Sequence, residues 1–132
     1  MATSKGGRFV EALKALEDGR DVEPLAALHG TEADISNPLV PHVHHGPEGA
    51  RQFWSGYRAT FDTVRSEFHH VEDGDDVSFL EWTSSGRSNQ GRDFTYRGVS
   101  VVEWEGEQIH AFRTYFDPRH LGEQIGTAGN RD

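Results

Sequence analysis

From about residue 63 to residue 116, side chains alternate in a way that predicts four consecutive β-strands. The expected strands cover residues 63–72, 76–87, 92–105 and 108–116, and the turn-forming sequences Asp-Gly-Asp, Asn-Gln-Gly and Glu-Gly separate them. Consecutive strands with such short turns form an antiparallel meander. Asp117-Pro118 follows the last strand, and this pair is typical of a helix start with Asp117 as the N-cap. The carboxy-terminal half is therefore restricted to one antiparallel sheet.

The amino-terminal half carries helical periodicity instead, with apolar residues recurring at three- and four-residue spacing. The expected elements are, in order, a helix over about residues 6–18, a short helix that ends at Gly30, a strand over 32–37, an ordered loop over 38–45 and a helix that begins at Gly46. The last of these helices has the clearest apolar stripe, which includes Phe53, Trp54 and Tyr57.

Helices that come first and strands that come later predict the α+β class, with the helices covering the concave face of a bent sheet. The 132 residues suit one domain. We expect that domain over residues 8–122, between a flexible start (1–7) and a flexible tail (123–132). Apolar residues make up 34% of the chain and aromatic residues 11%, which is enough to form a core and argues against disorder.

Charge and composition exclude several classes of function. The net charge of -9 and the lack of a basic patch argue against binding to nucleic acid or to an anionic membrane surface. The chain has no cysteine, so disulfides, thiolate zinc sites and a cysteine nucleophile are excluded. No secretion signal or membrane span is visible, so we expect a cytoplasmic protein. We expect no cofactor.

The order of the elements resembles that of the SnoaL-like group in the nuclear transport factor two superfamily, which includes ketosteroid isomerase, limonene epoxide hydrolase and polyketide cyclases. The resemblance spans about residues 8–122. Its local matches are Arg-Phe-Val-Glu-Ala-Leu, Ser-Asn-Pro before the loop, and Phe-Arg-Thr-Tyr-Phe-Asp at the end. It implies a cone-shaped, cystatin-like α+β barrel, with three main helices packed on a curved meander sheet around a cavity for a small apolar molecule. It also implies a homodimer through the convex face of the sheet.

The resemblance locates catalytic positions of two relatives, and this chain lacks their acids. The isomerase pattern places its general base at Asn37, its oxyanion tyrosine at Phe9 and its second aspartate at Ser100. An asparagine amide takes up no proton at neutral pH, and Phe9 has no hydrogen to donate. The aspartate, arginine and aspartate of the epoxide hydrolase fall at Thr83, Glu81 and Thr114. Neither relative's mechanism is therefore expected.

The strand phase implied by the resemblance turns Glu81 into the cavity as the only carboxylate on that part of the wall. An apolar cavity disfavours a charged carboxyl, which suits a general acid or base. Asn37 would then orient a ligand oxygen or a water. In the alternatives, Glu81 pairs with an arginine or faces solvent, and Asn37 closes a turn before Pro38. The other expected wall residues are Phe9, Ile35, His42, Trp54, Tyr57, Thr83, Tyr96, Ser100, Phe112 and Thr114, although Trp54 and Tyr57 also suit a plain core.

Three histidines, His42, His44 and His45, lie in the loop that the resemblance places at the cavity mouth. Adjacent histidines in an extended chain point apart, and no nearby carboxylate completes a ligand set, so we expect no metal site. A histidine that shuttles protons, or a polar lid, remains open.

Three functions stay open on the sequence. The first is a SnoaL-like enzyme that acts on an apolar or polyketide-like ligand by proton transfer, cyclisation or water addition. The second is a non-catalytic binding or carrier module with the same cavity. The third is an interaction domain whose cavity is filled by its own aromatic side chains, which an open cavity would argue against.

Overall fold

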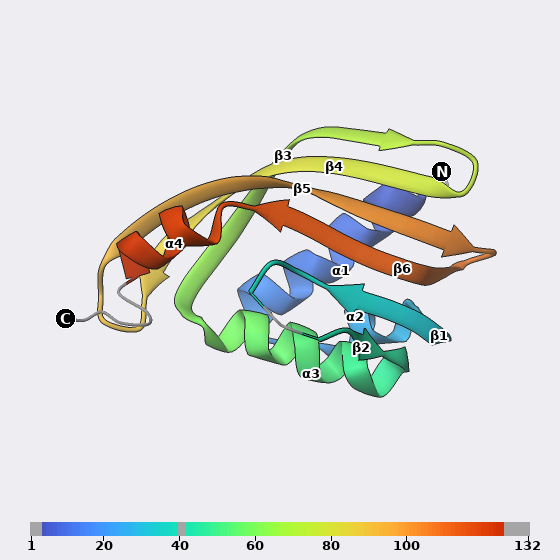
Figure 1. The fold of residues 1–132 in the computed structure, drawn as a ribbon, viewed down its shortest axis with the longest axis horizontal. Helices are drawn as coiled ribbons and strands as arrows, with labels where there is room; N and C mark the ends of the chain where they lie inside the picture. Colours follow the sequence, from blue (N-terminus) through green and yellow to red (C-terminus); the bar gives the residue numbers. More distant parts are fainter. Residues whose placement is uncertain (1–3, 40–41, 126–132) are drawn as a thin grey trace.

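One curved, six-stranded sheet dominates the protein (Figure 1). The structure is a computed structural model that describes residues 4–39 and 42–125. The strands are β1 (His29–Ser36), β2 (His44–His45), β3 (Phe61–Asp73), β4 (Val77–Ser88), β5 (Asp93–Glu105) and β6 (Gln108–Phe116). Their order across the sheet is β2-β1-β6-β5-β4-β3, and all neighbours are antiparallel except β1 and β6. The predicted meander is therefore confirmed as β3 to β6.

The helices of the described residues lie mainly on one side of this sheet. They are α1 (Lys5–Gly19), α2 (Glu23–Ala27), α3 (Gly46–Ala59) and α4 (Pro118–Ile125). Figure 1 shows α1, α2 and α3 under the concave face, while α4 follows β6 at the other end of the curved strands. Asp117 caps α4, because its Oδ1 accepts hydrogen bonds from the backbone N–H groups of Arg119 and His120. The predicted α+β class and helix-covered concave face are confirmed.

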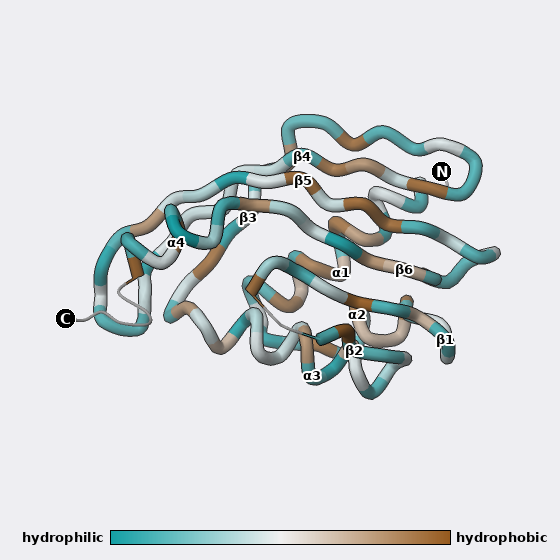
Figure 2. Tube along the Cα trace, viewed as in Figure 1, coloured by the Kyte–Doolittle hydropathy of each residue, from teal (hydrophilic) through white to brown (hydrophobic). Residues whose placement is uncertain are grey.

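The apolar residues form two adjoining buried clusters between the helices and the sheet. One joins α1 and α3 to the middle strands and includes Phe9, Trp54 and Phe112. The other lies towards α4 and includes Phe61 and Tyr96. Figure 2 shows hydrophobic residues spread through all parts of the trace rather than gathered in one element. None of the described helices combines the length and the apolar character needed to cross a bilayer.

Some element boundaries differ from those predicted. His44 and His45 form the short strand β2 instead of belonging to a loop, because they pair with Ile35 and Asp34 of β1. The second helix ends at Ala27 rather than Gly30, since β1 already begins at His29. At the termini, α1 starts within the segment predicted to be flexible and α4 extends into the predicted tail, while residues 126–132 lie outside the described residues.

Candidate functional site

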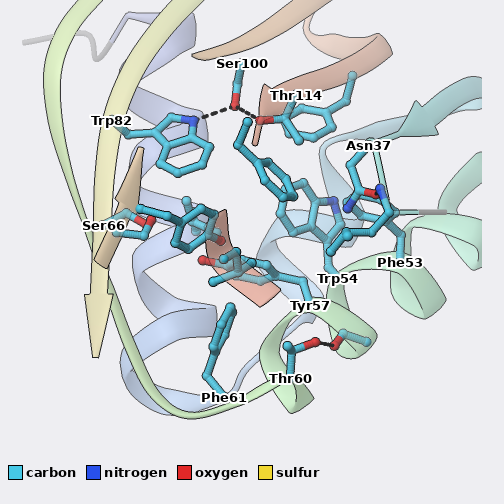
Figure 3. A pocket seen from close by; sticks show the side chains of 18 of the residues that line it. Asn37, Phe53, Trp54, Tyr57, Thr60, Phe61, Ser66, Trp82, Ser100 and Thr114 are labelled. Carbon is cyan, nitrogen blue, oxygen red and sulfur yellow. Dashed lines mark hydrogen bonds between the residues drawn. The ribbon is translucent and has the colours of Figure 1, made fainter. Parts of the chain in front are cut away.

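A cavity of about 370 Å³ lies between the helices and the concave face of the sheet (Figure 3). This volume falls in the range of small-molecule sites, roughly 300–1,000 Å³. Ten aromatic side chains contribute to its wall, and they belong to Phe9, Phe53, Trp54, Tyr57, Phe61, Phe68, Trp82, Tyr96, Phe112 and Phe116. These rings line the space and leave it open.

Trp54 is the centre of the helical wall. The ring centroids of Phe53, Tyr57 and Phe112 lie 5.0, 5.7 and 4.9 Å from that of Trp54, in edge-to-face arrangements. Phe53, Trp54 and Tyr57 occupy neighbouring positions on one face of α3, because residues three and four apart lie on the same side of a helix. Packed in this way, the rings have little freedom to collapse into the cavity.

A chain of hydrogen bonds crosses the sheet wall of the cavity. Trp82 Nε1 donates to Ser100 Oγ at 2.9 Å, and Ser100 Oγ donates to Thr114 Oγ1 at 2.9 Å (Figure 3). Thr114 Oγ1 in turn donates to the carbonyl oxygen of Val99 at 3.3 Å. Each hydrogen in this chain already has an acceptor, so towards a ligand the two hydroxyl oxygens offer lone pairs.

Glycine at position 98 allows Trp82 to lie across the sheet. Trp82 pairs directly with Gly98 of β5, and a Cβ atom at position 98 would come within 2.7 Å of the indole ring and 2.4 Å of the carbonyl oxygen of Tyr115. Any larger residue would displace the ring and with it the Nε1 group that begins the hydrogen-bond chain.

A second polar group lies where α1, α3 and β3 meet. Glu17 Oε2 accepts hydrogen bonds from Tyr57 Oη and Ser66 Oγ, both at 2.6 Å, and Oε1 accepts one from the Ser66 backbone N–H at 2.9 Å. Ser66 Oγ is also 2.6 Å from Ser84 Oγ. Burial raises the pKa of Glu17, and the hydrogen bonds from Ser66 and Tyr57 act in the opposite direction. Tyr57, Ser66 and Ser84 all line the cavity, whereas Glu17 lies behind them.

Two polar atoms of the cavity residues are buried without a hydrogen-bond partner among the described residues. They are Trp54 Nε1 and His44 Nδ1. Both side chains line the cavity. An indole nitrogen is a donor and never an acceptor, so an oxygen of a ligand that reaches Trp54 Nε1 would satisfy it.

The structure places eight of the predicted site residues on the cavity wall. They are Phe9, Asn37, Trp54, Tyr57, Tyr96, Ser100, Phe112 and Thr114. Ile35 is instead fully buried in the core, and His42 is exposed. Its neighbour His44, with a ring centroid 5.2 Å away, lines the cavity in place of His42. The alternative prediction for Asn37, that it closes a turn before Pro38, also holds in part. Asn37 Oδ1 accepts a hydrogen bond from the backbone N–H of Leu39.

The predicted orientation of Glu81 is wrong. Its side chain is 57% exposed on the convex face, where Oε1 lies 3.7 Å from Nε2 of His70. Thr83 is on the same face, with Oγ1 2.8 Å from Nε2 of His69. Directly opposed residues in an antiparallel pair point to the same face. Since β4 pairs Leu80 with Ser100, the even-numbered residues of β4 must face the cavity.

The sequence analysis missed Glu17, a carboxylate that is hydrogen-bonded to the cavity residues Tyr57 and Ser66. Its side chain is buried, with 4% of the residue exposed. The helical pattern contained the signal, because Glu17 follows Leu13 by four residues and therefore lies on the apolar face of α1.

The histidines do not form a cluster of ligands. His45 Nδ1 lies 2.7 Å from Oδ1 of Asp34 in an exposed pair, while His44 turns inward against Phe53. Within residues 4–39 and 42–125, no three histidine, aspartate or glutamate side chains come together in a way that could hold a metal ion.

Solved structures with the same fold are numerous but distant in sequence. A Catenulispora acidiphila protein with a ketosteroid isomerase-like fold, in complex with trimethylamine, is 17% identical, with a TM-score of 0.78 over 91% of this chain and 93% of that one. TerC co-crystallised with polyporic acid is 16% identical, with a TM-score of 0.80 over 94% and 100%. An epoxide hydrolase of M. tuberculosis, like limonene epoxide hydrolase, is 18% identical, with a TM-score of 0.72 over 93% and 90%.

The sequence also matches a family model, although no curated protein matches it. The model describes the SnoaL-like domain and covers residues 7–112. This match includes α1, α3 and nearly all of the sheet, and the solved structures share the fold that encloses the cavity. The resemblance inferred from the sequence is thus confirmed, and the chain belongs to the SnoaL-like domain family.

Proposed function

We propose that this protein binds a small, largely aromatic or alicyclic molecule that carries oxygen substituents. The observation that carries the proposal is the open cavity of about 370 Å³, whose wall contains ten aromatic side chains. Among the described residues, its lining contains no Asp, Glu, Lys or Arg, so a charged ligand would lose its hydration without gaining a counter-charge. The complex of TerC with polyporic acid supports an organic ligand in this fold.

Polar atoms around the cavity define how such a ligand would be oriented. Trp54 Nε1 is a donor for a ligand oxygen, whereas Ser100 and Thr114 offer lone pairs from another wall. A few polar groups in an otherwise apolar site fix orientation and specificity, while the apolar wall supplies most of the affinity. A ligand with an acceptor at one end and a polar hydrogen at another therefore fits better than a pure hydrocarbon.

Catalysis on such a ligand is the second candidate, in the form of proton transfer, cyclisation or water addition on a polyketide-like molecule. Glu81 no longer supports it, because this side chain lies outside the cavity. One observation favours it: the Glu17 carboxylate is linked to the cavity through the hydroxyl groups of Tyr57 and Ser66. Conversion of a ligand extracted from the purified protein, followed by mass spectrometry, would separate an enzyme from a carrier.

Replacing Trp54 with phenylalanine is expected to weaken binding of acetophenone roughly fivefold to tenfold, because it removes one hydrogen-bond donor while keeping an aromatic ring. Binding of ethylbenzene, which has no oxygen, should change much less. Isothermal titration calorimetry with both probes gives the comparison.

Trp104→Phe is the matched control for this substitution. The Trp104 indole donates to Ser78 Oγ at 3.0 Å and does not line the cavity, so this variant should leave both affinities unchanged. Equal losses for acetophenone and ethylbenzene in Trp54→Phe would contradict the assigned donor. A wild-type protein that bound neither probe, and released no small molecule on denaturation, would contradict the proposed function itself.

We also propose a homodimer through the convex face of the sheet. Phe79, Val99 and Tyr115 are exposed there on adjacent strands, and the Arg113–Glu103 ion pair lies beside them. An exposed apolar group with polar neighbours suits a self-complementary interface. Tyr115→Glu should shift the mass measured by light scattering from dimer to monomer, while Val43→Glu, in the loop, should not. A monomeric wild-type protein would refute the dimer.

A further inference from the structure

The hydroxyl groups next to Glu17 have a defined direction when the carboxylate is ionised. Tyr57 Oη and Ser66 Oγ each have one hydrogen, and both hydrogens point to Glu17 Oε2. Because the Ser66 hydrogen is used in this way, the 2.6 Å contact between Ser66 and Ser84 must be donated by Ser84. Glu17 therefore orients the Tyr57 and Ser66 hydroxyl groups directly, and the Ser84 hydroxyl group through Ser66.

These hydroxyl groups form a continuous polar strip on the cavity wall. Tyr57, Ser66 and Ser84 come from α3, β3 and β4, and all three line the cavity (Figure 3 labels Tyr57 and Ser66). With their hydrogens directed towards Glu17 or along the strip, their oxygens offer lone pairs to the cavity. A ligand that reaches this strip must supply a hydrogen or leave it unpaired.

We propose that the cavity selects a ligand whose end at the Tyr57–Ser66–Ser84 strip carries a hydrogen-bond donor, such as a phenolic or alcoholic hydroxyl. The Glu17 carboxylate makes this selection by holding the hydroxyl hydrogens of Tyr57 and Ser66 away from the ligand. This inference rests on the proposed small-molecule function and specifies the chemistry of one end of the ligand.

Protonation of Glu17 would remove the preference for a donor. A neutral carboxyl group must donate its own hydrogen to Tyr57 or Ser66, and the hydroxyl group that receives it becomes free to donate into the cavity. Burial raises the pKa of Glu17, which brings this change closer to neutral pH. Glutamine at position 17 would imitate the neutral form, because its amide N–H₂ group also donates to these hydroxyl groups.

Several charged or titratable groups from the surrounding elements face Glu17. Asp18 of α1 raises its pKa through repulsion. Arg58 of α3 donates from Nε to the Glu17 carbonyl oxygen at 3.1 Å, and Glu17 contributes to raising the pKa of Tyr96 of β5. Beyond Glu17, a second cavity of about 280 Å³ is lined in part by Lys14 and Glu67. Glu17 itself lines that second cavity, which offers a route for proton exchange that avoids the ligand.

The test compares 4-propylphenol with 4-propylanisole, which differ in a hydroxyl hydrogen replaced by a methyl group. In the wild-type protein at neutral pH, calorimetry should show the phenol binding roughly fivefold to tenfold more tightly, as expected for one hydrogen bond in a buried site. In Glu17→Gln this ratio should fall to near one at every pH. In the wild type it should fall towards the same value as the pH is lowered to the acid limit of folding.

Glu67→Gln is the matched control, because Glu67 lines the second cavity without belonging to the hydroxyl strip. This variant should keep the wild-type ratio and its pH dependence. If Glu17→Gln fails to fold, the pH series on the wild type still decides the question. A ratio that stays constant with pH in the wild type would overturn the inference while leaving the proposed function intact. If neither probe binds, the proposed function and this inference fail together.

Discussion

Replacing Arg58 with methionine is expected to lower the free energy of unfolding by about 3 kcal/mol. The guanidinium is buried and donates to the carbonyl oxygens of Glu17, Phe61 and Asp62 at 3.1, 3.0 and 3.2 Å. Methionine fills a similar volume but leaves the buried carbonyl groups of Glu17 and Phe61 without this donor. Each buried, unpaired carbonyl group costs roughly 1–3 kcal/mol. Denaturant unfolding of both proteins measures the difference.

Arg20→Gln is the matched control for Arg58. Arg20 also donates to the Asp62 carbonyl oxygen, at 2.9 Å, but it does so from an exposed position. Its replacement should change stability by only about 0.5 kcal/mol, as is usual for surface substitutions. Equal effects of the two substitutions would show that Arg58 does not join the end of α1 to the start of β3. Because Arg58 also holds the backbone of Glu17, its loss should alter the phenol-to-anisole ratio as well.

Lowering the pH from 6.5 to about 4 is expected to remove about 3 kcal/mol of stability through His29 alone. Burial lowers the pKa of His29 to about 4 from its usual 6.5, while the hydrogen bond between Nδ1 and the Leu25 carbonyl opposes this. Below pH 6.5 the unfolded chain binds a proton at this position and the native protein does not. The contribution of His29 to the free energy of unfolding is therefore fully present above pH 6.5, and it is lost as the pH falls towards 4.

Unfolding measured across this pH range should show the decline, and His29→Leu should flatten it even though this variant is less stable at neutral pH. The exposed His120 provides the control, because His120→Gln should keep the wild-type slope. Glu17 acts in the opposite sense: burial raises its pKa in the native state, so stability is lost as the pH rises from the unfolded-state pKa of Glu17 to its native-state pKa. A slope that is the same in His29→Leu and in the wild type would contradict the role of His29.

Local sequence patterns were sufficient for most of the fold. The alternation from residue 63 onward and the short turns between strands predicted β3 to β6 closely, because a meander depends on contacts between neighbouring segments. The apolar stripe of α3 and the cap at Asp117 were equally local. The strand β2 was missed because its two residues are held only by pairing with β1, which no period within His44-His45 can indicate.

The site was less predictable, and Glu81 and Glu17 show why. A strand with Phe79, Leu80, Glu81 and Trp82 in succession suggests no clear inner face until its register with β5 is known. The phase taken from the resemblance turned Glu81 inward, whereas the pairing of Leu80 with Ser100 turns it to solvent. Glu17 lay on an apolar stripe that the sequence shows. Its partners Tyr57 and Ser66 are 40 and 49 residues away in sequence, so no local pattern could indicate these hydrogen bonds.

The sequence by itself determined the class of fold, which follows from its periodicity, and the family, which the order of the elements and a few local matches indicated through a resemblance. Tertiary structure alone decided which carboxylate approaches the cavity. The reason is physical: a one-residue change of phase moves a strand side chain from one face of the sheet to the other. Whether a carboxyl group is buried and hydrogen-bonded depends on elements that meet only when the chain has folded, as α1, α3 and β3 do around Glu17.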